Sequence, residues 1–183
     1  MSKQALIVVD IQNDYFPGGK WTLVGADAAA AKAAQVLAAF RAAGDLVVHI
    51  RHEATDKDAP FFVAGSEGAQ IHPSVINHTG EPVIVKHHIN SFRDTELQAV
   101  LEQHGIDTLV IVGSMSHMCT HGITRAAVDF GYATTVIHDA CATLDLEFNG
   151  VQVPAAQVHA AFMAALAFGY APVISAQEFL AGR

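Results

Sequence analysis

The stretch DTLVIVGSMSHMCTHGITRAA, residues 107–127, joins an apolar run to a helical pattern through a short polar turn. Its first part, DTLVIV, has the length and the β-branched content of a buried strand. After Cys119 the apolar residues keep the period of a helix, and Gly131 is placed to end it. The stretch therefore predicts a strand, a turn and a helix, with a thiol at the start of the helix.

The same alternation of strand and helix recurs along the chain. Other short apolar runs are continuous, as expected of strands that are covered on both faces. They occupy residues 5–10, 45–50, 82–86, 133–138 and 172–175, and further helical patterns occupy residues 26–43, 95–104 and 155–168. These elements predict the α/β class, with helices on both faces of a parallel sheet in a doubly wound domain.

The bulk composition is typical of one globular domain spanning residues 1–183. Hydrophobic residues make up 51% of the chain and charged residues 15%, which argues against disorder. The net charge of −8 is spread along the chain without basic runs, so we expect neither a nucleic-acid nor a membrane-surface partner. The partner that we expect is a small-molecule substrate.

The cysteine content and the N-terminus predict a cellular compartment. Cys119 and Cys141 are too few for a disulfide framework. The N-terminal sequence MSKQALIVVD leads into a strand pattern without a signal peptide's apolar stretch, and no apolar run approaches the ~18 residues of a membrane span. We therefore expect a cytoplasmic protein with reduced thiols.

The segment from residue 51 to residue 81 interrupts the alternation of strands and helices. It is rich in Pro, Gly and Asp and carries the aromatic pair Phe61 and Phe62. Loops of this length in a compact domain are often functional, so we expect this one to line or cover a site. A phosphate-binding loop is not predicted, because the chain has neither a GxGxxG nor a GxxxxGK[ST] pattern.

Polar residues stand at three strand ends, where open α/β sheets bind their ligands. Asp10 follows the run ALIVV, Lys86 follows PVIV, and Cys119 follows DTLVIV and its turn. If these three strands are neighbours in the sheet, a carboxylate, an ammonium group and a thiol converge in one crevice. Such a crevice would be a thiol active site.

Each of these residue types fits a role in thiol chemistry. A free cysteine has a pKa of about 8.5, and a helix N-terminus with a nearby cation, here Lys86, lowers it toward a reactive thiolate. Asp10 could accept the thiol proton and later return a proton to a leaving amine. Backbone N–H groups in the turn before Cys119 could hold the developing oxyanion.

Structural roles remain open for the same residues. A cysteine at a helix start is more often a small buried hydrophobe. An aspartate at a strand end is usually a turn cap, and a lysine there is usually solvated. Cys141 also follows a strand, but it has no equivalent set of partners, so Cys119 is the candidate nucleophile.

The eleven histidines raise the question of a metal site. His117 and His121 flank Cys119, but positions two apart on a regular helix point about 200° apart, so these three side chains cannot ligate one ion. His87 and His88 are adjacent and face differently, and no HExxH motif occurs. We predict no metal and no cofactor.

Three segments together closely resemble one family. DIQNDYF (10–16), the Lys86 strand followed by NSFRDTEL (90–97), and VGSMSHMCTHGITRAA (112–127) are similar to the isochorismatase-like cysteine hydrolases, which include nicotinamidases and N-carbamoylsarcosine amidases. The resemblance spans nearly the whole chain. It implies three αβα layers with a six-stranded, mainly parallel sheet, and a homo-oligomer, either a dimer or a tetramer.

The resemblance also implies a catalytic arrangement. Cys119, Asp10 and Lys86 would form the triad, the peptide bond between Ser114 and Met115 would be cis, and the N–H groups of Met115 and Cys119 would form the oxyanion hole. Cys119 would attack a small amide, carbamoyl or ureido substrate, and water would hydrolyse the resulting thioester to an acid.

The chain departs from the nicotinamidases after the second strand. Those proteins resemble one another in a metal-binding Asp-x-His there, whereas this chain has HIRHEATD (49–56), so zinc is not implied. In the branch that cleaves the vinyl ether of isochorismate the cysteine is not required, so Cys119 favours amide chemistry. The alternatives are a vinyl ether hydrolase and a non-catalytic binding or assembly protein on the same fold.

Aromatic and polar side chains near these motifs are candidates for lining the substrate pocket. They are Phe16, His52, Phe61, Phe62, Ser91, Phe92 and His117. For each aromatic residue, packing in the core is the alternative. The apolar segment AAFMAALAFGYAPV (160–173) could form either a subunit interface or part of the core.

Overall fold

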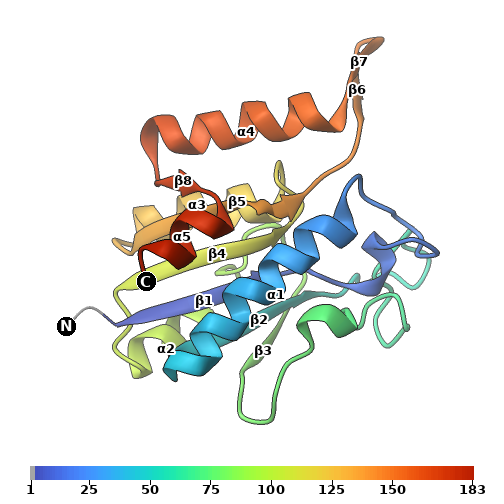
Figure 1. The fold of residues 1–183 in the computed structure, drawn as a ribbon. Coiled ribbons are helices and arrows are strands. Elements are labelled where there is room, and N and C mark those ends of the chain that lie inside the picture. Colours follow the sequence, from blue (N-terminus) through green and yellow to red (C-terminus); the bar gives the residue numbers. More distant parts are fainter. Residues whose placement is uncertain (1–2) are drawn as a thin grey trace.

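A six-stranded parallel sheet forms the centre of the molecule (Figure 1), which is represented by a computed structural model describing residues 3–183. The strands lie in the order β3-β2-β1-β4-β5-β8. Their bounds are Gln4–Val9 for β1, Leu46–His52 for β2, Val83–Lys86 for β3, Thr108–Ser114 for β4, Ala133–Ala142 for β5 and Val173–Ile174 for β8. The predicted fold class is therefore confirmed, although positions 1 and 2 of the predicted domain lie outside the described residues.

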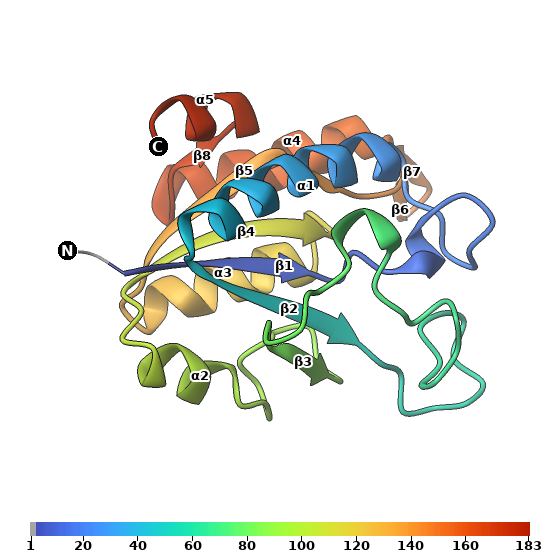
Figure 2. The same cartoon turned by 60° about the horizontal axis from the view of Figure 1, so that its bottom comes forward.

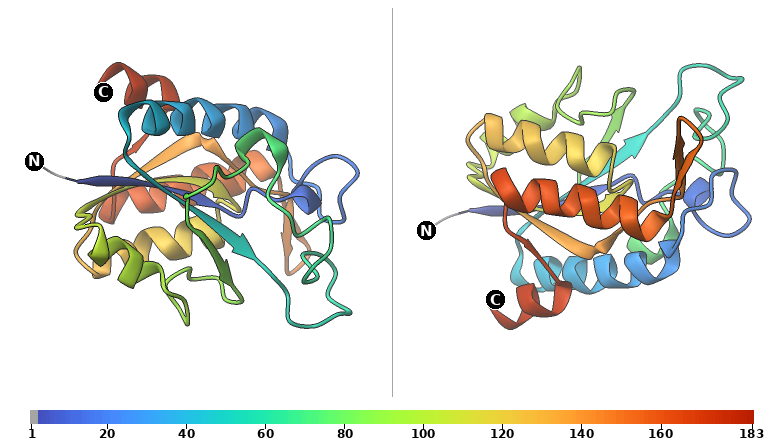
Figure 3. Two further views of the ribbon diagram at one scale, coloured as in Figure 1. Left: turned by 90° about the horizontal axis from the view of Figure 1, so that it is seen from below. Right: turned by 90° about the horizontal axis from the view of Figure 1, so that it is seen from above.

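Helices cover both faces of the sheet (Figure 3). On one face lie α1 (Ala26–Ala43) and α5 (Ala176–Ala181), and on the other lie α2 (Leu97–Gln103), α3 (Cys119–Asp129) and α4 (Ala155–Gly169). The pattern predicted from the sequence, with strands buried on both sides, is thus observed. Within residues 3–183, no helix has both the length and the apolar character that crossing a bilayer requires.

Strand β1 shows why the apolar runs are continuous. Ala5, Ile7 and Val9 pack into the core beneath α2, α3 and α4, whereas Leu6 and Val8 pack into the core beneath α1. All five side chains are at most 2% exposed. Alternate residues of a strand point to opposite faces, so a strand with helices on both sides needs an apolar residue at every position.

The order of the strands reverses between β1 and β4. The chain builds β1, β2 and β3 outward to one edge, returns to place β4 beside β1, and then builds toward the other edge. The loops that follow these strands gather at their carboxyl ends, together with the long segment between β2 and β3 (Figure 2). This reversal point is where doubly wound sheets bind ligands.

A hairpin and a helix were not predicted although the sequence carries their signals. The hairpin of β6 (Leu146–Phe148) and β7 (Val151–Val153) turns at Asn149 and Gly150, whose φ angles are 52° and 80°. Asn-Gly between alternating residues is the usual signature of such a turn. Helix α5 begins with a capping box, in which the Ser175 and Glu178 side chains each bond the other's backbone N–H.

Gly113, near the end of β4, permits a close approach of two strands. Its φ angle is 125°, and a Cβ atom there would lie 2.0 Å from the carbonyl oxygen of Val9. Only glycine fits such a contact. The backbone of β4 therefore lies directly against the end of β1, one residue before Asp10.

Candidate active site

The ammonium group of Lys86 lies at the centre of the three residues proposed from the sequence. Its Nζ is 2.9 Å from Oδ2 of Asp10 and 3.0 Å from Sγ of Cys119. Asp10 and Lys86 are fully buried, and Cys119 is 4% exposed. Three groups that are distant in sequence thus meet in one largely dry location.

The three strands that precede these residues are not all neighbours in the sheet. Strand β3 is not a neighbour of β1, because β2 lies between them. Lys86 ends β3 in register with His52, the last residue of β2. The long side chain of Lys86 spans the width of β2, a reach that a shorter cationic side chain would not have.

Asp10 is held in an unusual backbone conformation at the end of β1. Its φ angle is 49°, in the left-handed region that aspartate tolerates better than most residues. The N–H of Asp10 donates to the carbonyl of Ile50 at 3.1 Å. Oδ1 of Asp10 is buried and accepts no hydrogen bond from the described residues, so it is free to accept a proton.

The pKa of Cys119 is raised, whereas its position at the start of a helix predicted a lowered pKa. Burial raises the pKa of the thiol to about 12, with the negative charge of Asp10 adding to the effect. Lys86 opposes this increase but does not cancel it. Because burial outweighs the cation, the resting enzyme holds a neutral thiol instead of the predicted thiolate.

Lys86 and His52 take complementary protonation states. Burial tends to lower the pKa of Lys86, but contact with Asp10 and Cys119 outweighs it and the pKa is raised. Burial lowers the pKa of His52, and the nearby Lys86 charge contributes in the same direction. Nδ1 of His52 lies 3.2 Å from Nζ of Lys86. A neutral imidazole therefore accepts a hydrogen bond from the ammonium group.

The turn between β4 and α3 contains two backbone N–H groups that form no hydrogen bond to the described residues. The peptide bond between Ser114 and Met115 is cis. The carbonyl of Met115 accepts hydrogen bonds from the N–H groups of Met118 and Thr120. Within the described chain, no hydrogen bond is formed by the N–H of Met115 or of Cys119. Both donors are available to an incoming oxygen atom.

Neighbouring elements hold this turn in place. The N–H and hydroxyl of Ser116 both donate to the carbonyl of Ala142, and its hydroxyl lies 2.8 Å from Nδ1 of His159 on α4. His117, proposed from sequence as a lining residue, bonds the hydroxyl of Thr143 at 2.7 Å through Nδ1. His117 is therefore placed to hold the turn against the segment after β5.

Comparison with known proteins identifies the family. A model described as the isochorismatase domain matches residues 4–178. The chain belongs to the isochorismatase family. It is a hydrolase of that family, and the resemblance noted in the sequence is confirmed.

Three relatives show how close the match is. The uncharacterized isochorismatase family protein YddQ of Bacillus subtilis is 47% identical over 176 residues, covering 96% of this chain and 98% of that protein. The crystal structure of a putative isochorismatase hydrolase from Oleispira antarctica is 60% identical, with a TM-score of 0.96, and the match covers 99% and 97% of the two chains. Maleamate amidohydrolase of Pseudomonas putida is 30% identical over 151 residues, covering 75% of this chain and 71% of that protein.

Two residues of the hydrolase's first motif have roles that sequence reasoning missed. The Gln12 amide accepts from the N–H of His52 and donates to the carbonyls of His52 and Ala69. The Asp14 carboxylate accepts from the N–H of Phe62 at 2.7 Å and of Lys20 at 3.1 Å. Both side chains are buried in the structure, and buried polar groups are normally bonded. The signal in the sequence was their presence as polar residues within DIQNDYF.

A group of four aromatic residues lies beside the centre. The ring centroid of Phe62 is 4.6 Å from Tyr15, 4.9 Å from Phe61 and 6.1 Å from His52. Phe61 also stacks on Trp21 at 4.8 Å. We call Tyr15, Trp21, Phe61 and Phe62 the aromatic group. His52 lies between Phe62 of the aromatic group and Nζ of Lys86, so the aromatic group lies next to the centre.

Tyr15 was not proposed from the sequence, yet its electrostatics place it near the reacting groups. Burial raises the pKa of its hydroxyl well above the usual range, with the charges of Asp10 and Cys119 contributing. The residue is 2% exposed. Nε1 of Trp21 is buried and forms no hydrogen bond to the described residues, so the aromatic group contains one buried donor without a protein acceptor.

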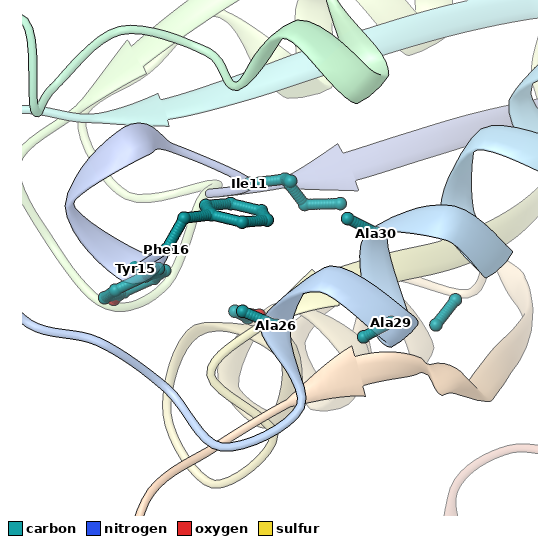
Figure 4. A pocket seen from close by; sticks show the side chains of 8 residues that line it. Ile11, Tyr15, Phe16, Ala26, Ala29 and Ala30 are labelled. Carbon is teal, nitrogen blue, oxygen red and sulfur yellow. The ribbon is translucent and has the colours of Figure 1, made fainter. Parts of the chain in front are cut away.

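Phe16, a proposed lining residue, packs beside the nucleophile turn. Its ring stacks on His72 with centroids 3.6 Å apart. Together with Ile11, Tyr15 and Ser114 it lines a cavity against α1 (Figure 4), whose volume of about 10 Å³ has room for about one water molecule. The cavity is too small for a substrate.

Phe92 is placed differently from the expectation. Phe92 packs against Phe130 and Tyr132, with centroids 5.1 and 6.1 Å away. These residues follow the far end of α3, roughly 16 Å along an eleven-residue helix from Cys119. Phe92 is therefore a core residue at that end. Ser91 is fully buried beside it in sequence, and its hydroxyl has no protein partner among the described residues.

The same centre contains the one cluster among residues 3–183 whose donors could hold a metal ion. An oxygen of Asp10, a ring nitrogen of His52 and Sγ of Cys119 lie within 4.8 Å of one another. All three residues contact Nζ of Lys86. The ammonium group therefore occupies the position that a cation would take.

Proposed function

We propose that this isochorismatase-family hydrolase cleaves a C–N bond in a small amide, carbamoyl or ureido compound through a Cys119 thioester. The contact of Lys86 Nζ with both Asp10 and Cys119, at 2.9 and 3.0 Å, carries the proposal. A relative named maleamate amidohydrolase supports the amide class. The buried centre supports cofactor-independent acyl transfer, since it supplies a nucleophile, a base and a cation.

Acylation begins when Sγ of Cys119 attacks the substrate carbonyl while Asp10 takes the thiol proton. The thiol's raised pKa requires this proton transfer to accompany attack. The carbonyl oxygen becomes an oxyanion that the N–H groups of Met115 and Cys119 stabilise. Collapse of the tetrahedral intermediate breaks the C–N bond, and Asp10 gives its proton to the leaving nitrogen. Ammonia or an amine departs and the thioester remains.

Deacylation uses the same groups in the opposite order. Asp10 takes a proton from water as the water oxygen attacks the thioester carbonyl. The two N–H groups again stabilise the oxyanion. Collapse expels the sulfur of Cys119, which recovers its proton from Asp10, and a carboxylic acid leaves. Lys86 balances the negative charge on Asp10 and sulfur throughout.

The aromatic group supports a preference for the acyl part of the substrate. Its rings offer flat apolar surface, Tyr15 contributes a hydroxyl, and Trp21 Nε1 is a buried donor without an acceptor among the described residues. A buried donor without an acceptor is costly, so a ligand acceptor there is favoured. We therefore favour a small, planar acyl group that carries a carbonyl or carboxylate oxygen away from the scissile bond.

Replacing Tyr15 by phenylalanine is expected to raise KM about 3- to 10-fold for an acceptor-bearing substrate, because one hydrogen bond is worth roughly 0.5–1.5 kcal/mol. For an analogue without the acceptor, KM should not change. Steady-state kinetics on both compounds make the comparison. Tyr132→Phe, at the other end of α3, is the matched control. An equal effect on both substrates would contradict a direct contact.

The proposed function is tested by a screen for release of ammonia or amine from small amides, carbamoyl compounds and ureido acids. Rapid quenching of an active mixture, followed by intact-mass measurement, should reveal the acyl group on Cys119. If no compound releases nitrogen and no acyl adduct forms, the proposal is wrong. Hydrolysis of a vinyl ether that persists in Cys119→Ala would instead identify the ether-cleaving alternative.

We further propose that the hydrolase forms homo-oligomers through the outer face of α4. The exposed residues of α4 are alanines, Phe168 and Gly169, apart from Gln157, and Phe168 is 96% exposed. The helix has no Asp, Glu, Lys or Arg, which suits contact between copies that each carry a net charge of −8. Apolar faces of this kind mark interaction sites.

Light scattering after size exclusion should show a dimer or tetramer for the native chain and a monomer for Phe168→Glu, because a buried charge at the interface is costly. Ile76→Glu places the same charge at a half-exposed residue outside α4 and should leave the assembly unchanged. A native monomer would refute the proposal.

A further inference from the structure

Asp10, His52 and Cys119 present the donor types that soft divalent metals prefer. A carboxylate oxygen, a ring nitrogen and a sulfur lie within 4.8 Å of one another. These are the usual protein ligands of Zn²⁺, and three of them leave a fourth position open. The set comes from the ends of β1 and β2 and from the start of α3, so it is held by three separate elements.

A second observation concerns the Asp10 carboxylate at the same place. Oδ1 of Asp10 is buried and has no hydrogen-bond partner among the described residues. The ammonium group of Lys86 contacts the other oxygen, Oδ2. One carboxylate oxygen thus remains available to a ligand within the centre.

The distances show that the cluster fits an ammonium group more closely than a metal ion. Nζ of Lys86 lies 2.9 Å from Asp10, 3.0 Å from Cys119 and 3.2 Å from His52. Zinc binds these atom types at about 2.0–2.3 Å, so the donors would have to move inward by roughly 0.7 to 1.2 Å each. Nζ also approaches the carbonyl of His88 at 3.0 Å, a further oxygen at the same position.

We propose that Asp10, His52 and Cys119 form a latent divalent-metal site, and that the Lys86 ammonium group keeps metals out of it. A metal ion and the ammonium group would be two cations at one position, where repulsion is strong because the location is buried. On coordination, the sulfur–metal bond forms as Cys119 releases its proton to solvent. Lys86 thereby protects the thiol from metal poisoning in addition to any part in hydrolysis.

Titration with Co²⁺ tests the proposal without reference to activity. In Lys86→Met, a near-ultraviolet charge-transfer band from thiolate to Co²⁺ should appear with one equivalent of metal and one proton released. The dissociation constant should be at least about 100-fold smaller than for the native chain. Zn²⁺ should displace Co²⁺, because this order of affinity is general for such donors.

Matched variants identify the ligands. In the Lys86→Met background, Cys119→Ser should abolish the band, whereas Cys141→Ser, at the other buried cysteine, should leave it intact. His52→Ala in the same background should weaken binding by at least about 10-fold. A band that survives Cys119→Ser would overturn the assignment.

A second variant, Lys86→Gln, and a second measurement, the Tm, keep the test decisive if Lys86→Met folds poorly. Lys86→Gln removes the charge while keeping a polar side chain, and saturating metal should raise the Tm of either variant by about 5–10 °C at 100 times the Kd. Under the same conditions the native chain should be at most about half-saturated, with a Tm change of no more than about 1–2 °C. Native binding as tight as that of the variants would refute the protective role of Lys86, whether or not the hydrolase proposal holds.

Discussion

Replacing Cys119 by alanine is expected to lower kcat for C–N hydrolysis by on the order of 10⁴-fold or more, because the covalent intermediate can no longer form. Residual catalysis from the oxyanion donors and binding alone is small in nucleophile-based enzymes. The measurement is steady-state release of ammonia or amine from the best substrate of the screen. Intact-mass spectra should at the same time lose the acyl adduct.

Cys141 supplies the matched control for this experiment. It is also buried, its thiol bonds the carbonyl of Ile137 at 3.3 Å, and its pKa is likewise raised, to about 12, chiefly by burial. Cys141→Ser should retain native turnover because the residue has no contact with Lys86 or Asp10. Turnover of Cys119→Ala within tenfold of the native rate would rule out thioester catalysis.

Replacing Asp10 by asparagine is expected to have opposite effects on turnover and on thiol reactivity. Loss of the base should reduce kcat by about 10²- to 10⁴-fold. The charge of Asp10 contributes, after burial, to the raised pKa of Cys119, so its removal should lower that pKa while Lys86 continues to favour the thiolate. The variant should therefore be alkylated faster by iodoacetamide while hydrolysing more slowly.

The pH dependence of alkylation measures this change. In the native chain the pKa of about 12 means that the thiolate fraction, and hence the rate, keeps rising about tenfold per pH unit from pH 7 to 10. In Asp10→Asn the rise should level off at lower pH. Asp129→Asn, an exposed site at the other end of α3, should follow the native curve. Slower alkylation in Asp10→Asn would contradict the electrostatic explanation.

Much of the fold could be predicted because strands buried on both faces leave uninterrupted apolar runs. Because open α/β sheets bind ligands at the carboxyl ends of their strands, the positions of Asp10, Lys86 and Cys119 after such strands indicated a site. The structure brings all three together, although β2 separates β3 from β1. Strand order depends on which connections cross the sheet, and local sequence does not encode it.

The features that could not be predicted depend on tertiary packing. The thiol of Cys119 is less acidic than a helix N-terminus suggests, because its depth and the approach of Asp10 arise only in the folded chain. Similarly, the aromatic character of Phe92 did not reveal that it faces the far end of α3. Tyr15 lies within DIQNDYF, and its proximity to the charges of Asp10 and Cys119 arises only in the folded chain.

The Gln12 side chain has a consequence for how freely the loop after β2 can be altered. Its amide forms three hydrogen bonds, two with the backbone of His52 at the end of β2 and one with the carbonyl of Ala69, which lies later in the segment between β2 and β3. Between these anchors, residues 55–58 are exposed. Insertions and randomised codons at 55–58 should therefore be tolerated while the chemistry is preserved, which makes this exposed stretch a suitable place to attach a tag or a second domain.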